Sequence, residues 1–299
     1  MCSSFIMSVE MRKKETDMIA ILTDSTCDIP EELVAEYDIQ IIPQYIIWGD
    51  EQYRDRVEIS PKEFYQRLEK ETQKPTSSQA TTYDFLTAIN EAVEQGATEA
   101  IILTVSSAMS GTYQMAKTAA EKAEIPVSVI DSKGPTMSLG WQVLAAARAR
   151  DEGLGTAEIV ERVAQVRESL VQIVAMETLE YLEYGGRIGD AAKWVGTMLK
   201  VKPVVMINHT TGRVEPAGLA RTHKAMVRML NKKFFEAVDT GKQLHIAVLH
   251  GNALEEAQNL MTHIREEFDP EELLINITGP VLGINTGPGA LALCGYSTD

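Results

Sequence analysis

Short apolar runs alternate with amphipathic stretches through the first half of the chain. The apolar runs, which predict buried strands, cover residues 18–22, 39–48, 100–105 and 127–130. The amphipathic stretches predict helices over residues 64–71, 83–95, 113–123, 138–152 and 156–170. Strands that alternate with helices across short loops are typical of βαβ units, so we predict a parallel sheet for this half.

The pattern changes after residue 170. Further strands are predicted at residues 171–176, 244–249 and 273–277, and helices at residues 190–199, 222–238 and 254–268. Two short runs, 203–208 and 213–217, flank a polar turn and predict a β-hairpin. A loop or short helix is expected at residues 179–189, and a glycine-rich segment closes the chain at 279–290.

These elements predict an α/β protein of two lobes. The N-terminal lobe, residues 18–170, is expected to hold the parallel sheet, and the C-terminal lobe, residues 171–299, a mixed α/β structure with the hairpin. Residues 1–17 lack the apolar core of a signal peptide, and we expect them to be a disordered extension.

Two helix starts carry capping signals. Ser60 and Glu63 frame Pro61 in the pattern of a capping box, which predicts a helix beginning there. Asp28 precedes Pro30 in a similar way, so we interpret Asp28 as a helix N-cap.

The composition narrows the classes of function. Apolar residues make up 44% of the chain and charged residues 24%, and the net charge of −15 argues against nucleic acid or an anionic membrane as partner. No apolar run approaches the ~20 residues of a membrane span, so we expect no stable membrane insertion. The three cysteines have no disulfide or zinc spacing, and we expect a cytoplasmic protein.

Three hydroxyl-rich segments adjoin predicted strands and helices, at residues 23–26, 76–79 and 106–112. In parallel α/β sheets, ligands bind beyond the carboxyl ends of strands, where helix N-termini offer free N–H groups. Hydroxyl groups there could hold a carboxylate or phosphate without a lysine or arginine. Serine and threonine are also ordinary N-cap residues, and the pattern alone leaves both interpretations open.

Other chemistry is less well supported. Asp24, Asp28 and Asp131 suit turns and a cap better than a metal site, so no metal is expected. Residues 287–292 match G-x-G-x-x-A, but they lie too near the end of this sequence for a βαβ unit to follow, so we expect no dinucleotide binding here. The five histidines form no recognisable catalytic or metal pair, and no Walker loop is present. We therefore predict no catalytic residue and no cofactor.

Residues 179–188 combine aromatic side chains, a Gly-Gly pair and Arg187. Such a segment suits a surface turn, and it equally suits a docking patch with Arg187 as its anchor. The residues alone do not separate these two interpretations.

Taken in order, seven short motifs resemble the bacterial DegV family, the fatty-acid-binding subunits of fatty acid kinase. They are TDSTCD at 23–28, PTSSQ at 75–79, SSAMSGTYQ at 106–114, DS at 131–132, LEYGGRI at 182–188, GPVLG at 279–283 and TGPG at 286–289. The resemblance covers residues 18 to about 296. It implies two α/β lobes with a long-chain fatty acid, such as palmitate or oleate, buried between them.

The resemblance also implies roles for particular residues. Ser77, Ser107 and Ser110 are expected to hold the fatty-acid carboxylate, and Arg187 to face a separate ATP-dependent kinase subunit that phosphorylates it. The protein itself would be a lipid-binding partner rather than an enzyme.

One position departs from the family pattern. The family usually carries a histidine just before TGPG, where this chain has Asn285. Asparagine can donate a hydrogen bond to the carboxylate but cannot carry charge, so affinity or competence in phosphoryl transfer is expected to be reduced. Two alternatives stay open. One is a stand-alone enzyme or sensor for a small carboxylated or phosphorylated ligand, and the other is a regulatory module that docks through residues 177–188.

Overall fold

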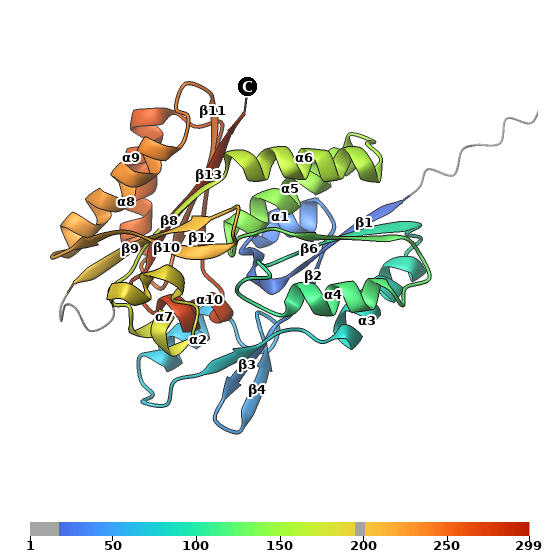
Figure 1. Cartoon of the computed structure of the whole chain (residues 1–299), viewed down its shortest axis with the longest axis horizontal. Helices are drawn as coiled ribbons and strands as arrows, with labels where there is room; N and C mark the ends of the chain where they lie inside the picture. Colours follow the sequence, from blue (N-terminus) through green and yellow to red (C-terminus); the bar gives the residue numbers. More distant parts are fainter. Residues whose placement is uncertain (1–17, 195–200, 299) are drawn as a thin grey trace, which may run out of the picture.

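A parallel sheet forms one side of the molecule (Figure 1). The computed structural model describes residues 18–194 and 201–298. The sheet has the strand order β2-β1-β6-β7, and all its pairings are parallel. Its strands are β1 (Ile19–Asp24), β2 (Ile39–Ile42), β6 (Glu99–Thr104) and β7 (Val127–Asp131). The predicted parallel sheet is therefore confirmed.

Helices cover both faces of this sheet (Figure 1). Ile21 on β1 packs in one apolar cluster with α5 (Met137–Asp151) and α6 (Thr156–Ser169). Its neighbour Leu22 points to the opposite face and packs with α3 (Thr82–Glu94) and α4 (Thr112–Ala120). Because both faces are buried, the central strands β1 and β6 have continuous apolar sequences rather than alternating ones.

The predicted strand 39–48 is two strands in different sheets. It breaks at Pro43 and Gln44, after which β3 (Tyr45–Trp48) pairs antiparallel with β4 (Glu51–Arg54) and β5 (Thr76–Ser78). Proline cannot donate to a sheet ladder, which accounts for the break. The predicted loop 76–79 is thus largely the edge strand β5. Helix α2 (Pro61–Leu68) starts with the predicted capping box of Ser60 and Glu63.

A six-stranded mixed sheet forms the other side of the molecule, in the order β10-β9-β8-β13-β11-β12. Its strands are β8 (Val171–Ala175), β9 (Lys202–Asn208), β10 (Arg213–Ala220), β11 (Gln243–His250), β12 (Glu272–Ile277) and β13 (Leu291–Thr298). The predicted hairpin is confirmed as β9 and β10, and it extends past a register shift between Pro216 and Gly218. Helices α8 (His223–Ala237) and α9 (Leu254–Phe268) match their predicted ranges closely.

The end of the chain is more regular than predicted. The glycine-rich segment contains α10 (Pro280–Thr286), and β13 follows it as a central strand between β8 and β11. Smaller elements complete the fold: the 3-10 helix η1 (Ser25–Cys27), α1 (Glu31–Glu36), α7 (Glu180–Tyr184) and the 3-10 helix η2 (Gly189–Trp194). Half of the helix predicted at 190–199 lies outside the described residues, as does the extension 1–17.

The N-cap interpretation of Asp28 is wrong. Asp28 adopts a left-handed backbone conformation at the end of η1, and α1 begins after Pro30 with no side-chain cap. The Asp28 carboxylate is fully buried and pairs with Arg56. Asp28 is therefore the buried ion-pair partner of Arg56 and does not cap a helix.

Helix α5 joins the two large sheets. It is buried almost all round, and its Trp141 Nε1 donates to the carbonyl oxygen of Cys294 on β13 at 3.1 Å. Each sheet takes its strands from one side of residue 170, whereas the largest apolar cluster contains residues from both sides. The lobe boundary at 170/171 stays a prediction.

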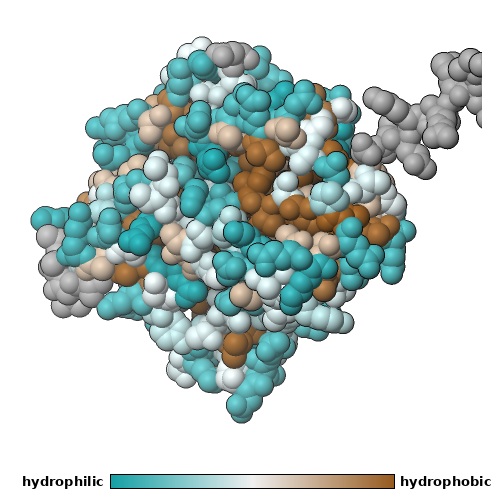
Figure 2. Space-filling view, turned by 45° about the vertical axis from the view of Figure 1, so that its right-hand side comes forward, coloured by the Kyte–Doolittle hydropathy of each residue, from teal (hydrophilic) through white to brown (hydrophobic). Residues whose placement is uncertain are grey.

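The face shown in Figure 2 is mostly hydrophilic, with a hydrophobic band on its right-hand side and smaller hydrophobic patches elsewhere. Among the described residues, no helix is both long enough and apolar enough to cross a bilayer.

Candidate functional site

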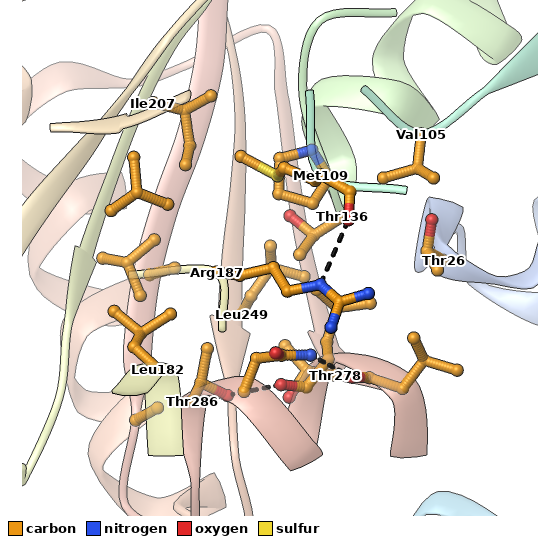
Figure 3. Close-up of a pocket in the computed structure, with 18 of the residues that line it drawn as sticks. Thr26, Val105, Met109, Thr136, Leu182, Arg187, Ile207, Leu249, Thr278 and Thr286 are labelled. Carbon is orange, nitrogen blue, oxygen red and sulfur yellow. Dashed lines mark hydrogen bonds between the residues drawn. The ribbon is translucent and has the colours of Figure 1, made fainter. Parts of the chain in front are cut away.

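A deep pocket opens between the parallel sheet and the six-stranded sheet (Figure 3). Residues just beyond the carboxyl ends of β1 and β6, Thr26 and Val105, form part of its wall. Its empty space, counted with the open mouth, is about 970 Å³. Its location matches the usual position of ligands in α/β sheets, outside the carboxyl ends of the strands.

The six-stranded sheet provides most of the apolar wall. On β8, Val174 faces the pocket, whereas its neighbours Ile173 and Ala175 face the core under α8. The same face carries further apolar residues of the wall, namely Met176, Val205, Ile207, Val214, Leu249 and Ala292. Alternation along the strands thus directs one set of side chains to the core and the other to the cavity.

Polar side chains gather in another part of the wall. Four of the five residues predicted for ligand or partner binding line the pocket: Ser77, Ser110, Arg187 and Asn285. They come from four segments far apart in the sequence. Among the described residues, Arg187 is the only charged side chain in the lining, so no carboxylate lines the cavity. The lining therefore favours an anionic group bound next to an apolar one.

The two serines differ in how they are held. Ser77 lies on β5, and its half-buried hydroxyl has no hydrogen-bond partner within the described part of the chain. The Ser110 hydroxyl lies 2.8 Å from Thr112 Oγ1, which in turn accepts from Gln44 Nε2 at 3.0 Å. Gln44 also accepts from the amide of Ala80. Ser110 is therefore fixed by its neighbours, while Ser77 is free to bind a ligand.

Ser107 is not part of the site. It is exposed, does not line the pocket, and its hydroxyl donates to Asp131. Its backbone amide also donates to Asp131, at 3.1 Å. The prediction that Ser107 holds the carboxylate is corrected accordingly: the loop turns Ser107 outward, whereas Ser110 lines the pocket.

Asn285 lies on α10 against α7. Its Nδ2 donates to the carbonyl oxygen of Val281 at 2.8 Å, and its Oδ1 is buried with no partner among the described residues. A Cβ atom at Gly185 would come within 2.1 Å of that Oδ1, so the glycine is what lets Asn285 approach. One amide hydrogen of Asn285 remains available to a ligand.

Arg187 reaches into the pocket from the turn after α7 (Figure 3). Its Nε donates to the carbonyl oxygen of Met109 at 3.1 Å, and its Nη1 donates to that of Gly185 at 2.5 Å. The residue is nevertheless exposed. Arg187, predicted only as a docking residue, thus borders both the cavity and the solvent.

Several lining residues were not predicted from the sequence. Gln44 follows a proline inside an apolar run, and Gln172 interrupts the apolar strand β8. A polar side chain within an otherwise apolar run of the sequence is the signal that could have marked both. Thr136 carries a different signal: it is a β-branched residue with a positive φ of 52°, which is a strained conformation.

A buried charged cluster lies beneath the pocket wall. Arg56 pairs with Asp28, and Asp55 accepts from the Ser25 hydroxyl at 2.6 Å. Burial raises the pKa of Asp55 to about 7 and also raises the pKa of Asp24, which accepts from Thr26. The cluster thus supports the wall residue Thr26 from behind.

The three aspartates first considered for metal binding do not assemble. Asp131 lies at the end of β7 and pairs with Lys133, away from Asp24 and Asp28. Within residues 18–194 and 201–298, no group of three histidine, cysteine, aspartate or glutamate side chains could hold a metal ion.

A family model described as "Uncharacterised protein, DegV family" matches residues 18–298. The chain belongs to the DegV family. The DegV domain-containing protein SA1258 of Staphylococcus aureus (strain N315) is 33% identical over 273 residues, which are 91% of this chain and 96% of that relative. The family resemblance suggested by the motifs is confirmed.

Solved structures of fatty-acid-binding proteins share this fold. A fatty-acid-binding DegV family protein from Thermus thermophilus has a TM-score of 0.86 and 31% identity, over 94% of this chain and 100% of that one. A stearic-acid-binding protein from Eubacterium ventriosum has a TM-score of 0.86 and 25% identity, over 94% and 98% of the two chains. The mixed α/β fold of this DegV chain, with one parallel and one mixed sheet, is the fold of these proteins.

Proposed function

We propose that the protein binds one long-chain fatty acid in the pocket and presents it to a kinase. The acyl chain lies along the apolar wall of the six-stranded sheet, and the carboxylate is held by Ser77, Ser110 and Asn285. The observation that carries the proposal is the lining itself, which joins an apolar cavity to hydroxyl, amide and guanidinium groups without any acidic side chain among the described residues.

The energetics favour a ligand of this kind. Each methylene group removed from water contributes about 0.8 kcal/mol, so the affinity depends mainly on the length of chain that the wall covers. Hydrogen bonds to a charged carboxylate contribute about 1.5–3 kcal/mol each, and they fix the direction in which the acid enters. The fatty-acid ligands of the Thermus and Eubacterium relatives support the same assignment.

The kinase half of the proposal rests on Arg187. The protein performs no chemistry alone; a separate ATP-dependent fatty acid kinase subunit, met in the cytoplasm, phosphorylates the carboxylate. Arg187 borders both the cavity and the solvent, so one side chain can sense the ligand and contact the partner. Asn285 lacks the charge of the histidine usual in the family, which weakens the hold on the carboxylate and affects this step first.

Replacing Ser77 and Ser110 together by alanine should weaken binding of palmitate or oleate about 100-fold or more, because two hydrogen bonds to the charged carboxylate are lost. Isothermal titration of the delipidated protein measures the change. Ser107→Ala is the matched control: the same substitution in the same loop, but outside the pocket, should leave affinity unchanged. If the double variant and Ser107→Ala changed the affinity equally, Ser77 and Ser110 would not bind the carboxylate.

Addition of ATP and a fatty acid kinase catalytic subunit should convert the bound acid to its acyl phosphate. Arg187→Ala should slow this conversion at least tenfold at saturating fatty acid. Arg54→Ala serves as control, because it removes another exposed arginine that is far from Arg187 in the sequence. If the loaded protein turns over a carboxylated or phosphorylated substrate with no partner present, the stand-alone enzyme is correct instead.

A further inference from the structure

The apolar wall of the pocket contains one polar pair. Thr136, at the start of α5, and Gln172, on β8, both line the cavity, and their exposed fractions are only 5% and 1%. Gln172 Nε2 donates to Thr136 Oγ1 at 3.2 Å. Val174 on β8 and Met176 just after the strand are the next two lining residues on this side, so the pair interrupts an apolar surface.

The Thr136 side chain does not serve its helix. Thr136 is the N-cap residue of α5, yet it makes no side-chain cap hydrogen bond, and its φ of 52° is unfavourable for a β-branched residue. The side chain lines the cavity instead and is among the residues labelled in Figure 3. Helix α5 therefore lacks a side-chain cap, an interaction that contributes about 1 kcal/mol.

A second layer of side chains fixes the pair from behind. The Ser138 hydroxyl donates to Gln172 Oε1 and lies 2.8 Å from His209 Nε2. Burial lowers the pKa of His209 to about 4, so its ring is neutral at pH 7. No cation lines this part of the described pocket, which disfavours a second carboxylate there.

The hydrogen-bond inventory of the pair leaves two donors unused. The Thr136 hydroxyl proton and one amide proton of Gln172 find no acceptor in residues 18–194 and 201–298. Buried donors of this kind are normally satisfied, here by whatever fills the cavity. An all-hydrocarbon chain cannot accept them, whereas a neutral oxygen on the chain can.

We propose that Thr136 and Gln172 form a subsite for a neutral oxygen group, such as a hydroxyl or keto group, carried by the acyl chain of the bound fatty acid. The inference rests on the proposed fatty-acid function and specifies its substrate class. In an apolar wall, an unpaired hydroxyl would weaken binding about 5- to 150-fold relative to the parent acid. When the hydroxyl stands at the position of the acyl chain that meets Thr136 and Gln172, their hydrogen bonds offset this loss of affinity.

The test uses delipidated full-length protein and titrates octadecanoic acid against a series of its monohydroxy derivatives, from the 2- to the 18-position. We expect at least one isomer to bind within about threefold of the parent acid, while the others bind tenfold or more weakly. The double variant Thr136→Val with Gln172→Leu should weaken the favoured isomer about tenfold relative to the parent acid. Thr286→Val is the matched control, because that hydroxyl lines the pocket but donates to the carbonyl oxygen of Leu282.

Each result decides the proposal. It is overturned if every isomer binds at least tenfold more weakly than the parent acid, or if the double variant leaves the ratio unchanged. It is also overturned if the double variant weakens parent and isomer equally, since the pair would then hold the carboxylate. Should the double variant not fold, Thr136→Val alone is measured by the same ratio. Failure of octadecanoic acid itself to bind the wild type would instead refute the fatty-acid function, and this subsite with it.

Discussion

Arg56→Met should lower the free energy of unfolding by about 3–5 kcal/mol, because it leaves the carboxylate of Asp28 buried without its cation. The side chain of Asp28 is 0% exposed and that of Arg56 15%. Asp28 also accepts from the amide of Gly279 at 2.9 Å, and its own carbonyl oxygen accepts from Asn276. Urea unfolding followed by circular dichroism measures the loss.

The loss should grow with pH. Burial raises the pKa of Asp28 and Arg56 lowers it, so removing the arginine raises that pKa further in the folded state. A carboxyl group with a raised folded pKa stabilises the protein below its unfolded pKa, and this contribution disappears as the pH rises through the folded pKa. The variant should therefore be closer to wild type at pH 5 than at pH 8.

Arg54→Met is the control for this experiment. Arg54 pairs with Glu58 on the surface, where both side chains are about half exposed, so its loss should cost less than about 1 kcal/mol. Equal destabilisation by the two substitutions would show that the buried pair has no special role.

This buried pair matters for the pocket because it connects two segments of its wall. Asp28 follows η1, which carries the lining residue Thr26, and Gly279 follows Thr278, another lining residue. The Arg56 guanidinium also donates to the carbonyl oxygen of Ile277, at the end of β12. The charged cluster thus holds the carboxyl ends of β1 and β12 at a fixed separation.

Ala292→Phe should weaken binding of palmitate or oleate about 100-fold or more. Ala292 lies on the central strand β13 and lines the cavity with a small side chain. A phenyl ring there would take the room of roughly four methylene groups, each contributing about 0.8 kcal/mol. Because Ala292 also belongs to the buried apolar cluster around α5, the melting temperature of the variant is measured beside its affinity.

Two comparisons make this result specific. Ala292→Ser changes the same position with little added volume and should bind long-chain acids nearly as well as wild type. Octanoic acid, which needs less of the cavity, should lose much less affinity in Ala292→Phe than palmitate does. Equal losses for the short and the long acid would contradict an acyl chain lying along this wall.

The elements with a clear period were predicted from the sequence, and those defined by long-range pairing were not. Helices such as α8 and α9 have strong amphipathic patterns, and the hairpin of β9 and β10 surrounds a recognisable turn. Strand β13 was not predicted, because its pairing with β8 and β11 depends on segments more than 40 residues away in the sequence. Asp28 was misassigned because a local capping pattern cannot reveal a partner such as Arg56 on another element.

The candidate site was likewise predicted where short motifs carry it and missed where only the fold brings residues together. Motif resemblance identified Ser77, Ser110, Asn285 and Arg187, all of which line the pocket, but it could not tell which of Ser107 and Ser110 does so. That depends on the contact between Ser107 and Asp131, which closes only when β6 and β7 pair. Thr136 and Gln172 were missed because neither belongs to a motif, and only the fold brings them together.

Native mass spectrometry of the purified protein, followed by titration of the delipidated protein with palmitate and oleate, tests whether the pocket holds one long-chain fatty acid. We expect a mass excess that corresponds to one such acid per chain, and saturable uptake of one equivalent after delipidation. A protein that is purified without lipid and takes up neither acid would contradict this expectation.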